Sequence, residues 1–379
     1  MVDYEFEVSI VMPCLNEEET IGICVEKAIE TMKKYGIKGE VVVIDNGSTD
    51  KSVQIAESLG ARVLSQPVRG YGNAYIKGLT NVRGRYIVMG DSDDSYDFTD
   101  IERFVVPLRD GYDMVMGTRL KGEIKKGAMP WLHRYVGNPV LSGFLNVLFK
   151  TGISDAHCGM RSFTKSAFEK MHLSACGMEF ASEMVINASK ANLKIKEIPI
   201  TLYPHGRSRR PHLRSFRDGW RHIRLMLIYS PTYLFLLPGI AFFFLGMSVI
   251  VALLGGPVYI GGHGYDVHVM VVGSLLAILG FQTINLGLYA KAISYTEEFY
   301  QVDNVIKTFY NIFTLERGLY FGLLFFSSGS GLMIYLLLKF LYNEGFSEMR
   351  LAILGMTLIV VGVQTIFSSF LLSMLNFNK

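Results

Sequence analysis

Residues 8 to about 120 alternate short apolar runs of strand length with segments whose apolar residues recur at helical spacing. The strand-like runs are Val8–Met12, Glu40–Ile44, Arg62–Leu64, Tyr86–Met89 and Asp113–Met116. The helix-like positions are Ile21, Val25, Ala28, Ile29 and Met32, followed by the segments Ala74–Thr80 and Thr99–Leu108. Strands that alternate with helices predict an α/β fold, in which a mostly parallel sheet has helices on both faces. Ligands of such sheets bind at the carboxyl ends of the strands.

Beyond residue 230 the pattern changes to four long apolar segments, each longer than the roughly 20 residues that cross a hydrocarbon core. Pro231–Gly262 carries no charged residue, and charged residues bound the other three segments, Val267–Ala290, Gly318–Leu338 and Leu351–Asn378. The sequence therefore predicts one domain over residues 1–230 and a transmembrane domain over residues 231–379, with four spans at about 232–255, 267–290, 318–340 and 351–375.

A cluster of arginines predicts the orientation of these spans. Seven arginines and one acidic residue, Asp218, lie between His205 and Arg224, shortly before the first span. Positive charge beside a span favours the cytoplasmic side, and an even number of spans returns the chain to the side where it started. Met1–Glu7 is acidic, and the first apolar run is too short for the core of a signal peptide. We therefore expect a multi-pass membrane protein whose N-terminal domain and both termini are cytoplasmic.

Two segments before the spans, at about 131–150 and 211–229, have the pattern of amphipathic helices. The first places Ser142 and Asn146 opposite an apolar stripe that consists of Val136, Val140, Leu141, Phe144, Leu145 and Leu148. The second has an apolar stripe of Phe216, Trp220, Ile223 and Leu227 beside a basic stripe of Arg210, Arg214, Arg217, Arg221 and Arg224. A basic face beside an apolar face suits a helix that lies in an anionic headgroup layer. We predict two interfacial helices, and the alternative is a helix on the surface of the soluble domain.

Composition excludes several protein classes. Hydrophobic residues make up 50% of the 379 residues and charged residues 19%, so the chain has enough apolar surface for a core and is not disordered. The four cysteines have no metal-ligand spacing, which indicates buried or incidental thiols in a reducing compartment. A formal net charge of +3 is too small to indicate a nucleic-acid partner.

Polar motifs follow three of the predicted strands, at Asn16–Glu19, Asp45–Asp50 and Asp91–Asp94. The carboxylates of Asp91–Asp94 repel one another unless a cation binds, and their hard oxygens suit Mg²⁺ or Mn²⁺ shared with a substrate diphosphate. The alternative is an acidic cluster at the N-terminus of the helix that begins near Thr99. Turn and capping chemistry explains Ser48 to Asp50 but not Asp45, whose carboxylate we expect to bind a ribose or a nucleobase.

Three motifs together resemble the inverting family 2 glycosyltransferases of GT-A fold, over residues 8 to about 230. Val11 to Glu18 is similar to the P-x-x-N-E-E start of that family, the Asp45 segment to its D-D-G-S-T-D, and Asp91 with Asp93 to its D-x-D. The sequence departs from the family at Asn46, which replaces the usual second acid. The resemblance implies a Rossmann-like GT-A domain, a nucleotide-sugar donor and a Mg²⁺ or Mn²⁺ ion on Asp91 and Asp93.

Within that family the chain most resembles the polyisoprenyl-phosphate glycosyltransferases, which include the dolichyl-phosphate mannose and glucose synthases. Gly117-Thr118-Arg119 with Arg134 is similar to their G-S-R…R pair, Asp155 to Arg161 to their D-x-x-S-G-F-R, and Gly206 to Arg210 to their G-x-S-(K/R) loop. One subgroup also has four C-terminal spans. Cys158 stands where serine is common, and Asp94-Ser95 stands where the mannose synthases often have Leu-Gln.

The resemblance assigns roles to individual residues. The residues implied to bind the nucleotide sugar are Pro13, Asn16, Glu17, Asp45, Asp91, Ser92, Arg207 and Arg209. Those implied to hold the acceptor phosphate are Arg119, Arg134 and Ser208, and those implied to be catalytic are Asp93, Arg119 and Arg134. Arg210 is an alternative to Arg209. Glu183 is either a site carboxylate or part of a solvated helix face, and Arg161 either anchors the acceptor loop or binds phosphate. His157 is expected to be structural.

The expected reaction is transfer of a hexose, glucose or mannose, from a UDP- or GDP-sugar to polyprenyl or dolichyl phosphate at the cytoplasmic membrane face. A phosphate nucleophile is already ionised near neutral pH and needs no general base. One alternative is a lipid hydroxyl acceptor, with Glu183 as the base. Another is a polysaccharide synthase, although the chain lacks their Q-x-x-R-W motif. A third is a lipid transporter with a nucleotide-binding domain, although no charged residue lies within the four apolar segments. Membrane lipids are expected partners, and the oligomeric state stays open.

Overall fold

The structure is a computed structural model that describes residues 4–208, 215–296, 314–342 and 348–376. The chain divides into two compact units, Met1–Met226 and Leu227–Lys379. Because their relative placement is not determined, each unit is described by itself.

The first unit alternates strands and helices, as predicted. Its first half contains β1 (Phe6–Cys14), α1 (Ile21–Lys34), β2 (Gly39–Asp45), α2 (Ser52–Ser58), β3 (Arg62–Ser65), α3 (Tyr71–Thr80), β4 (Gly84–Met89), a 3₁₀ turn (Phe98–Asp100), α4 (Ile101–Arg109) and β5 (Met114–Ile124). Its second half contains a π-helical turn (His133–Gly137), α5 (Asn138–Phe149), β6 (Arg161–Thr164), α6 (Lys165–Met171), α7 (Phe180–Lys190), β7 (Ile195–Leu202) and α8 (Ser215–Ile228), which ends just inside the second unit.

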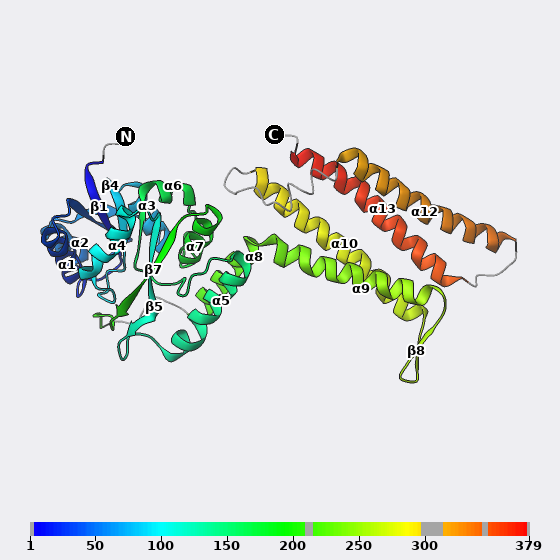
Figure 1. Cartoon of the computed structure of the whole chain (residues 1–379), viewed down its shortest axis with the longest axis horizontal. Coiled ribbons are helices and arrows are strands. Elements are labelled where there is room, and N and C mark those ends of the chain that lie inside the picture. Colours follow the sequence, from blue (N-terminus) through cyan, green and yellow to red (C-terminus); the bar gives the residue numbers. More distant parts are fainter. Residues whose placement is uncertain (1–3, 209–214, 297–313, 343–347, 377–379) are drawn as a thin grey trace. The chain divides into compact units, whose positions relative to one another are not determined.

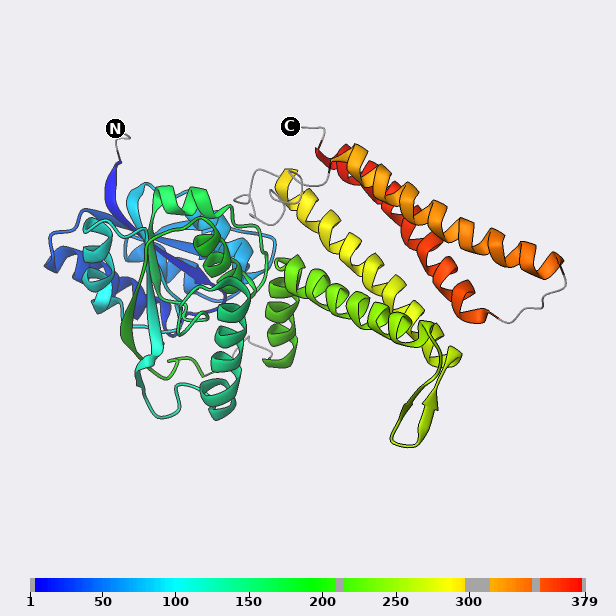
Figure 2. The same ribbon diagram turned by 45° about the vertical axis from the view of Figure 1, so that its right-hand side comes forward.

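Among the described residues these strands form a seven-stranded sheet in the order β3-β2-β1-β4-β6-β5-β7, with helices on both faces (Figures 1 and 2). Strand β6 is antiparallel to β4 and β5, and the other neighbours pair in parallel. This arrangement confirms the predicted α/β class and the mostly parallel, GT-A-like sheet. Strands β6 and β7 and helix α6 were not predicted, whereas α2 was expected only through the capping residues before it. Strand β5 runs eight residues beyond the predicted end, from Met116 to Ile124.

The central strands are apolar because both of their faces are covered. Val8, Ile10 and Met12 belong to the core cluster that includes α1 and α4. On the other face α3 lies against the strands at Gly78, where an added Cβ would lie 2.5 Å from Ile44 Cδ1 and 2.7 Å from Val11 Cγ1.

The register of the parallel strands brings the polar motifs to one edge of the sheet. Cys14 pairs with Asp45 at the ends of β1 and β2, and Val11 of β1 pairs with Met89, the last residue of β4. The three loops that follow these strands therefore leave the same edge, as the sequence predicts.

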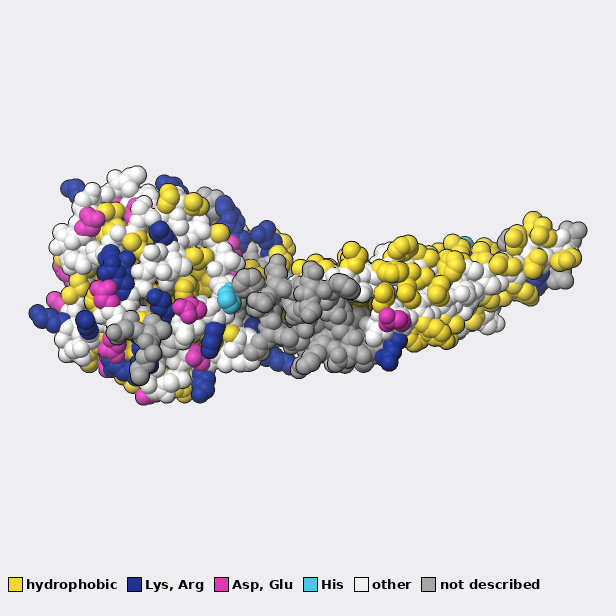
Figure 3. All heavy atoms as spheres, turned by 90° about the horizontal axis from the view of Figure 1, so that it is seen from above, with side chains coloured by type: hydrophobic (Ala, Val, Ile, Leu, Met, Phe, Trp, Pro, Cys, Tyr) yellow, Lys and Arg dark blue, Asp and Glu magenta, His cyan; other side chains and the backbone are white. Residues whose placement is uncertain are grey.

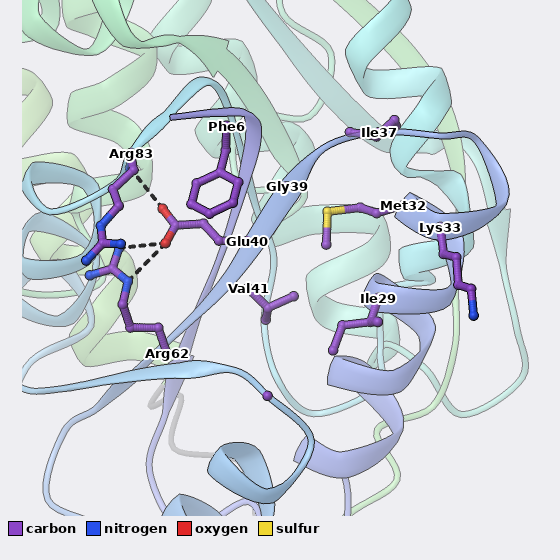
Figure 4. Close-up of a pocket in the computed structure, with 11 residues that line it drawn as sticks. Phe6, Ile29, Met32, Lys33, Ile37, Gly39, Glu40, Val41, Arg62 and Arg83 are labelled. Atoms are coloured by element: carbon purple, nitrogen blue, oxygen red, sulfur yellow. Dashed lines mark hydrogen bonds and ion pairs between the residues drawn. The ribbon is translucent and has the colours of Figure 1, made fainter. Parts of the chain in front are cut away.

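A hollow of about 490 Å³ lies at the opposite edge, where β1 and β2 begin (Figure 4). Its charged lining centres on Glu40, whose carboxylate accepts hydrogen bonds from Arg62 Nε at 2.9 Å, Arg83 N at 2.9 Å and Ser9 Oγ at 2.7 Å. These contacts tie the beginnings of neighbouring strands together, so Glu40 serves the fold.

The described part of the second unit contains four helices long and apolar enough to span a membrane: Thr232–Leu254, Val267–Ile293, Leu315–Leu341 and Met349–Leu375. The first consists of a π-helical turn (Thr232–Leu236) and α9 (Leu237–Leu254), and the others lie within α10 (Val267–Thr296), α12 (Leu315–Leu341) and α13 (Met349–Asn376). A hairpin of β8 (Val258–Ile260) and β9 (His263–Tyr265) joins α9 to α10. Hydrophobic side chains predominate among the coloured side chains of the spans in this view (Figure 3). The four predicted spans are confirmed.

Glycines allow the spans to pack backbone against backbone. An added Cβ at Gly246 of α9 would lie 2.4 Å from Ala277 N and Gly273 O of α10. In the second hairpin, a Cβ at Gly362 of α13 would lie 2.5 Å from Phe326 N of α12. The spans therefore form two close pairs, α9 with α10 and α12 with α13.

Candidate active site

Hydrogen bonds between the loops after β1 and β2 join them into one platform. Asn16 adopts a left-handed conformation with φ 56°, and its Oδ1 accepts a hydrogen bond from Thr49 N at 2.6 Å. Its own N–H donates to Ser48 Oγ at 2.9 Å, and Glu17 N donates to Ser52 Oγ at 2.7 Å. The carboxamide of Asn16 therefore holds the two loops together. The resemblance assigns the same residue to nucleotide-sugar binding.

Asp45 closes the turn that follows it. Its Oδ1 accepts from Ser48 N at 2.9 Å and its Oδ2 from Gly47 N at 3.4 Å. The expectation that turn chemistry leaves Asp45 unexplained is therefore wrong. The neighbouring Asn46 donates from Nδ2 to the carbonyls of Gln66 and Val68, and its Oδ1 accepts from Gly70 N. An ionised carboxylate could not make the two donor contacts, which explains an amide at this position.

The D-x-D segment lies directly after β4. Asp91 Oδ1 accepts from Tyr71 Oη at 3.0 Å, and Asp93 Oδ1 accepts from Ser95 N at 3.1 Å. Ser92 is buried and donates from Oγ to Pro13 O at 2.6 Å, so these two predicted donor-site residues tie the D-x-D segment to the β1 loop. The third carboxylate of the cluster, Asp94, is paired with Lys27 at 2.8 Å.

Asp91 and Asp93 fit a divalent cation shared with a substrate. Burial and the nearby charge of Asp93 raise the pKa of Asp91 to about 6. The hydrogen bond from Tyr71 and the positive charges of Arg207 and Arg119 lower this pKa but do not offset the rise. A cation would relieve this repulsion. No group of three or more His, Cys, Asp or Glu side chains that could hold a metal occurs within the described residues. Two carboxylates with substrate phosphates and water are a typical environment for Mg²⁺.

Arg207 bridges the two loops at this site. Its Nη1 contacts Glu17 Oε1 and its Nη2 contacts Asp93 Oδ2, both at 2.6 Å. The next residue, Ser208, donates from its N and Oγ to the carboxylate of Glu19, both at 2.7 Å, rather than contacting Arg119. Arg209 and Arg210 lie outside the described residues. The loop around Arg207 therefore covers the D-x-D segment.

Arg119 is held by Asp155, a residue of the D-x-x-S-G-F-R-like motif for which the sequence predicts no site role. Arg119 Nε and Nη2 donate to Asp155 Oδ2 and Oδ1, both at 2.7 Å, and Arg119 N also donates to Oδ2. Although burial opposes it, the charge and hydrogen bonds of Arg119 hold the pKa of Asp155 below its usual range. Asp155 therefore engages Nε and Nη2 of Arg119, and no hydrogen bond of Nη1 occurs among the described residues.

Arg134 lies in the π-helical turn before α5 and stacks over the Tyr135 ring at 5.3 Å. Burial and the positive charge of Arg119 lower the pKa of its neighbour His133. The turn that carries Arg134 therefore lies within electrostatic range of Arg119.

Three further residues have structural contacts. Glu183 is fully buried and accepts from Ser174 N, Ser174 Oγ and Ala175 N, so the alternative of a solvated helix face is wrong. Arg161 is also fully buried and donates to the carbonyls of Ala156, Cys158 and Ala181, which favours the anchoring role over phosphate binding. His157 lies 3.1 Å from Ser182 Oγ, in agreement with a structural role.

The two predicted amphipathic helices have exposed apolar faces. In α5, Ser142 and Leu145 are buried, whereas Val140 and Val147 are 60% and 62% exposed. Leu145 therefore belongs to the inward face rather than to the predicted outer stripe. In α8, Asp218, His222 and Met226 are buried, whereas Phe216 and Trp220 are 88% and 60% exposed. Of the predicted basic stripe, Arg210 and Arg214 lie outside the described residues.

Comparisons with known proteins identify the family of the chain. Residues 9–171 match the model of glycosyl transferase family 2, and residues 288–376 match the C-terminal transmembrane region of family 2 glycosyltransferases. The chain is 42% identical over 374 residues to the low-salt glycan biosynthesis hexosyltransferase Agl6 of Haloferax volcanii, covering 97% of this chain and 88% of that protein. It is 32% identical over 203 residues to the dolichyl-phosphate hexose transferase of the same organism, covering 53% and 85%.

The fold also matches a solved structure. A crystal structure of a mycobacterial protein aligns with a TM-score of 0.50 and 23% identity, covering 60% of this chain and 75% of that chain. This match concerns the fold alone. The family matches and the relatives, together with the four candidate spans, show that the chain is an integral membrane glycosyltransferase that belongs to glycosyltransferase family 2.

Proposed function

We propose that the protein transfers a hexose from a UDP- or GDP-sugar to polyprenyl or dolichyl phosphate at the cytoplasmic face of the membrane. The observation that carries this proposal is the charge around Asp91, where the carboxylate of Asp93 and the guanidinium groups of Arg207 and Arg119 all act on one half-buried acid. A donor diphosphate bound at Asp93 and Arg207 and an acceptor phosphate bound at Arg119 would therefore meet beside Asp91. Two relatives named as a hexosyltransferase and a dolichyl-phosphate hexose transferase support the sugar and acceptor classes.

The donor diphosphate would lie between the D-x-D segment and Arg207. Asp91 and Asp93 would hold Mg²⁺ or Mn²⁺, which supplies positive charge to the departing nucleoside diphosphate when bound. Arg207 now pairs with Glu17 and Asp93 at 2.6 Å, so a bound diphosphate would compete with these carboxylates for its guanidinium. The platform of Pro13, Asn16 and Asp45 would frame the nucleoside.

The acceptor phosphate would bind at Arg119 and Arg134. Asp155 fixes two nitrogens of Arg119, so the third has a defined direction. The phosphate oxygen is ionised near neutral pH and attacks the anomeric carbon without a general base. The bond from this carbon to the diphosphate breaks, and attack from the opposite side inverts the configuration, so that an α-linked donor gives a β-linked lipid product.

The lipid acceptor explains the amphipathic helices. The exposed Val140 and Val147 of α5 and the exposed Phe216 and Trp220 of α8 are suited to the headgroup and acyl boundary. The arginines that precede the first span favour the cytoplasmic side for this surface.

The site disfavours a lipid hydroxyl acceptor. Such an acceptor needs a general base, and Glu183, the candidate for that role, is fully buried with its carboxylate bonded to Ser174 and Ala175.

A transfer assay tests the proposal. Full-length protein in detergent receives a short polyprenyl phosphate, Mg²⁺ or Mn²⁺, and a panel of radiolabelled UDP- and GDP-hexoses. We expect one donor to give a chloroform-soluble product that mild acid cleaves, and we expect EDTA and Asp93→Ala to abolish it. The proposal fails if no donor labels the lipid while wild-type protein binds nucleotide sugars.

A further inference from the structure

We propose that Tyr71 is a positioning residue that orients the Asp91 carboxylate, and that buried Glu183 acts on the same carboxylate through the segment 174–176 and helix α3. This inference rests on the proposed metal-dependent transfer, because its consequence is the affinity of the Asp91–Asp93 pair for a divalent cation.

Tyr71 contacts Asp91 directly. Its Oη donates to Asp91 Oδ1 at 3.0 Å, and Tyr75 Oη lies 3.5 Å from the same oxygen. The other oxygen, Oδ2, faces Gly159, where an added Cβ would lie only 2.8 Å away. The carboxylate is therefore held on one side by a phenol and enclosed on the other by a glycine backbone. Outer-sphere hydrogen bonds of this kind orient ligating carboxylates.

Aromatic packing fixes the Tyr71 ring. Tyr71 and Tyr75 pack edge to face with ring centroids 4.9 Å apart. Tyr75 is fully buried and stacks on Phe180 of α7, with centroids 5.7 Å apart and ring planes 5° from parallel. The phenol of Tyr71 thus keeps its direction without a ligand.

The beginning of α3 is fixed by backbone contact with the segment 174–176. Gly70 has φ 152°, a conformation that favours glycine, and an added Cβ there would lie 2.4 Å from Cys176 O. At Gly72 the corresponding distance to Ala175 O is 1.9 Å. Asn73 N donates to Cys176 O at 3.2 Å. The helix turn that carries Tyr71 therefore takes its position from the backbone of residues 175 and 176.

Glu183 in turn fixes that segment. Its carboxylate accepts from Ser174 N at 3.0 Å, Ser174 Oγ at 2.8 Å and Ala175 N at 2.8 Å. Helix α7 therefore supports Tyr71 by two routes, through Phe180 and Tyr75 and through Glu183 and the segment 174–176. This connection gives Glu183 a role toward the site without contact with a substrate.

Metal binding tests the inference separately from turnover. Mn²⁺ binding to the full-length protein in detergent is measured by electron paramagnetic resonance, alone and with UDP or GDP, for wild type, Tyr71→Phe, Glu183→Gln and the double variant. Tyr35→Phe, in an exposed tyrosine after α1, is the matched control. We expect Tyr71→Phe to weaken Mn²⁺ binding about tenfold, the lower end of the range for lost outer-sphere contacts, with an unchanged melting temperature because the ring remains.

The double variant shows whether Tyr71 and Glu183 affect Mn²⁺ binding through one connection or independently. If both residues act through Asp91, the double variant binds Mn²⁺ no more weakly than the weaker single variant. Where Glu183→Gln does not fold, Ser174→Ala replaces it, since this change removes only one donor. Binding by Tyr71→Phe within twofold of wild type overturns the role of Tyr71, and independent, multiplicative losses overturn the link to Glu183. No Mn²⁺ binding by wild type, with either nucleotide, overturns the proposed metal site itself and this inference with it.

Discussion

Arg119 and Asp155 form a buried bidentate ion pair, in which Nε and Nη2 of the arginine each donate to a carboxylate oxygen at 2.7 Å. Arg119 lies on β5 and Asp155 precedes β6, so the pair joins neighbouring parts of the sheet. Planar guanidinium and carboxylate groups match in this geometry, which leaves the third nitrogen with a fixed direction.

The first prediction concerns this pair. Asp155→Asn leaves the buried Arg119 charge without its counter-ion, a loss that costs about 3–5 kcal/mol when one partner of a buried pair is removed. We expect a melting temperature several degrees lower and transfer to lipid phosphate reduced at least about 100-fold. Thermal unfolding and the transfer assay measure both effects.

A matched control is Glu123→Gln, since Glu123 forms an exposed pair with Lys125 at 2.7 Å. Solvent screens exposed pairs, which therefore contribute little to stability, so this variant should resemble wild type. Equal effects of the two variants would show that the buried geometry of Asp155 has no special role.

The second prediction concerns Arg207. Arg207→Gln removes the charge that we assign to the donor diphosphate, so kcat/KM for the nucleotide sugar should fall about 100-fold. Arg207→Lys keeps a charge but loses the two-pronged contact with Glu17 and Asp93, and an intermediate loss is expected. Steady-state kinetics measure both. Arg83→Gln, at the opposite edge of the sheet, should leave kcat/KM unchanged, and an equal loss there would contradict the assignment.

The third prediction is a pH dependence of stability. Burial lowers the pKa of His222 to about 4, although nearby Glu179 and Asp218 oppose the shift. Unfolded histidine has a pKa of about 6.5, so unfolding takes up a proton between these values. Neutral His222 therefore contributes up to about 3 kcal/mol to the free energy of unfolding. This contribution is complete above about pH 6.5 and is lost as the pH falls toward 4.

Melting temperatures at pH 7.5 and pH 5.0 measure this effect. We expect wild type to lose stability at pH 5.0, and we expect His222→Gln to lose less between the same two pH values. An identical pH dependence in the variant would exclude His222 as the source.

The fourth prediction concerns the spans. Gly246→Ala places a Cβ within 2.4 Å of the α10 backbone, so α9 and α10 must separate. Overpacking of this kind costs roughly 1–3 kcal/mol. Gly331→Ala in α12 meets nothing within 4 Å and is the control. Thermal unfolding in detergent should show a lower melting temperature for Gly246→Ala alone, and equal melting temperatures would argue against close packing at Gly246.

Local patterns predict much of this fold. The central strands and the four spans are long apolar runs, so their burial can be read along the chain. Strand β6 could not be predicted in this way because its four residues include the polar Arg161 and Ser162. Strand β7 alternates in burial and contains Pro199, which is compatible with its place at the edge of the sheet.

The site was predictable only in part, for a physical reason. Parallel strands carry their loops to one edge, so the meeting of the three polar motifs follows from the strand pattern. Which charges pair there does not follow from local pattern. Arg207 bonds to Glu17 across 190 residues, and Tyr71 bonds to Asp91 from a different helix. Such contacts depend on tertiary packing, as does the inward direction of Glu183.

The most direct test of the phosphate acceptor compares two lipids that differ only in that group. Initial rates of sugar transfer are measured for a short polyprenyl phosphate and for the matching polyprenol, with wild type and Arg119→Ala. We predict transfer to the phosphate alone, and we predict that Arg119→Ala loses most of this activity. Comparable transfer to the polyprenol, unaffected by Arg119→Ala, would contradict two assignments. These are the phosphate as the acceptor group and Arg119 as the residue that binds it.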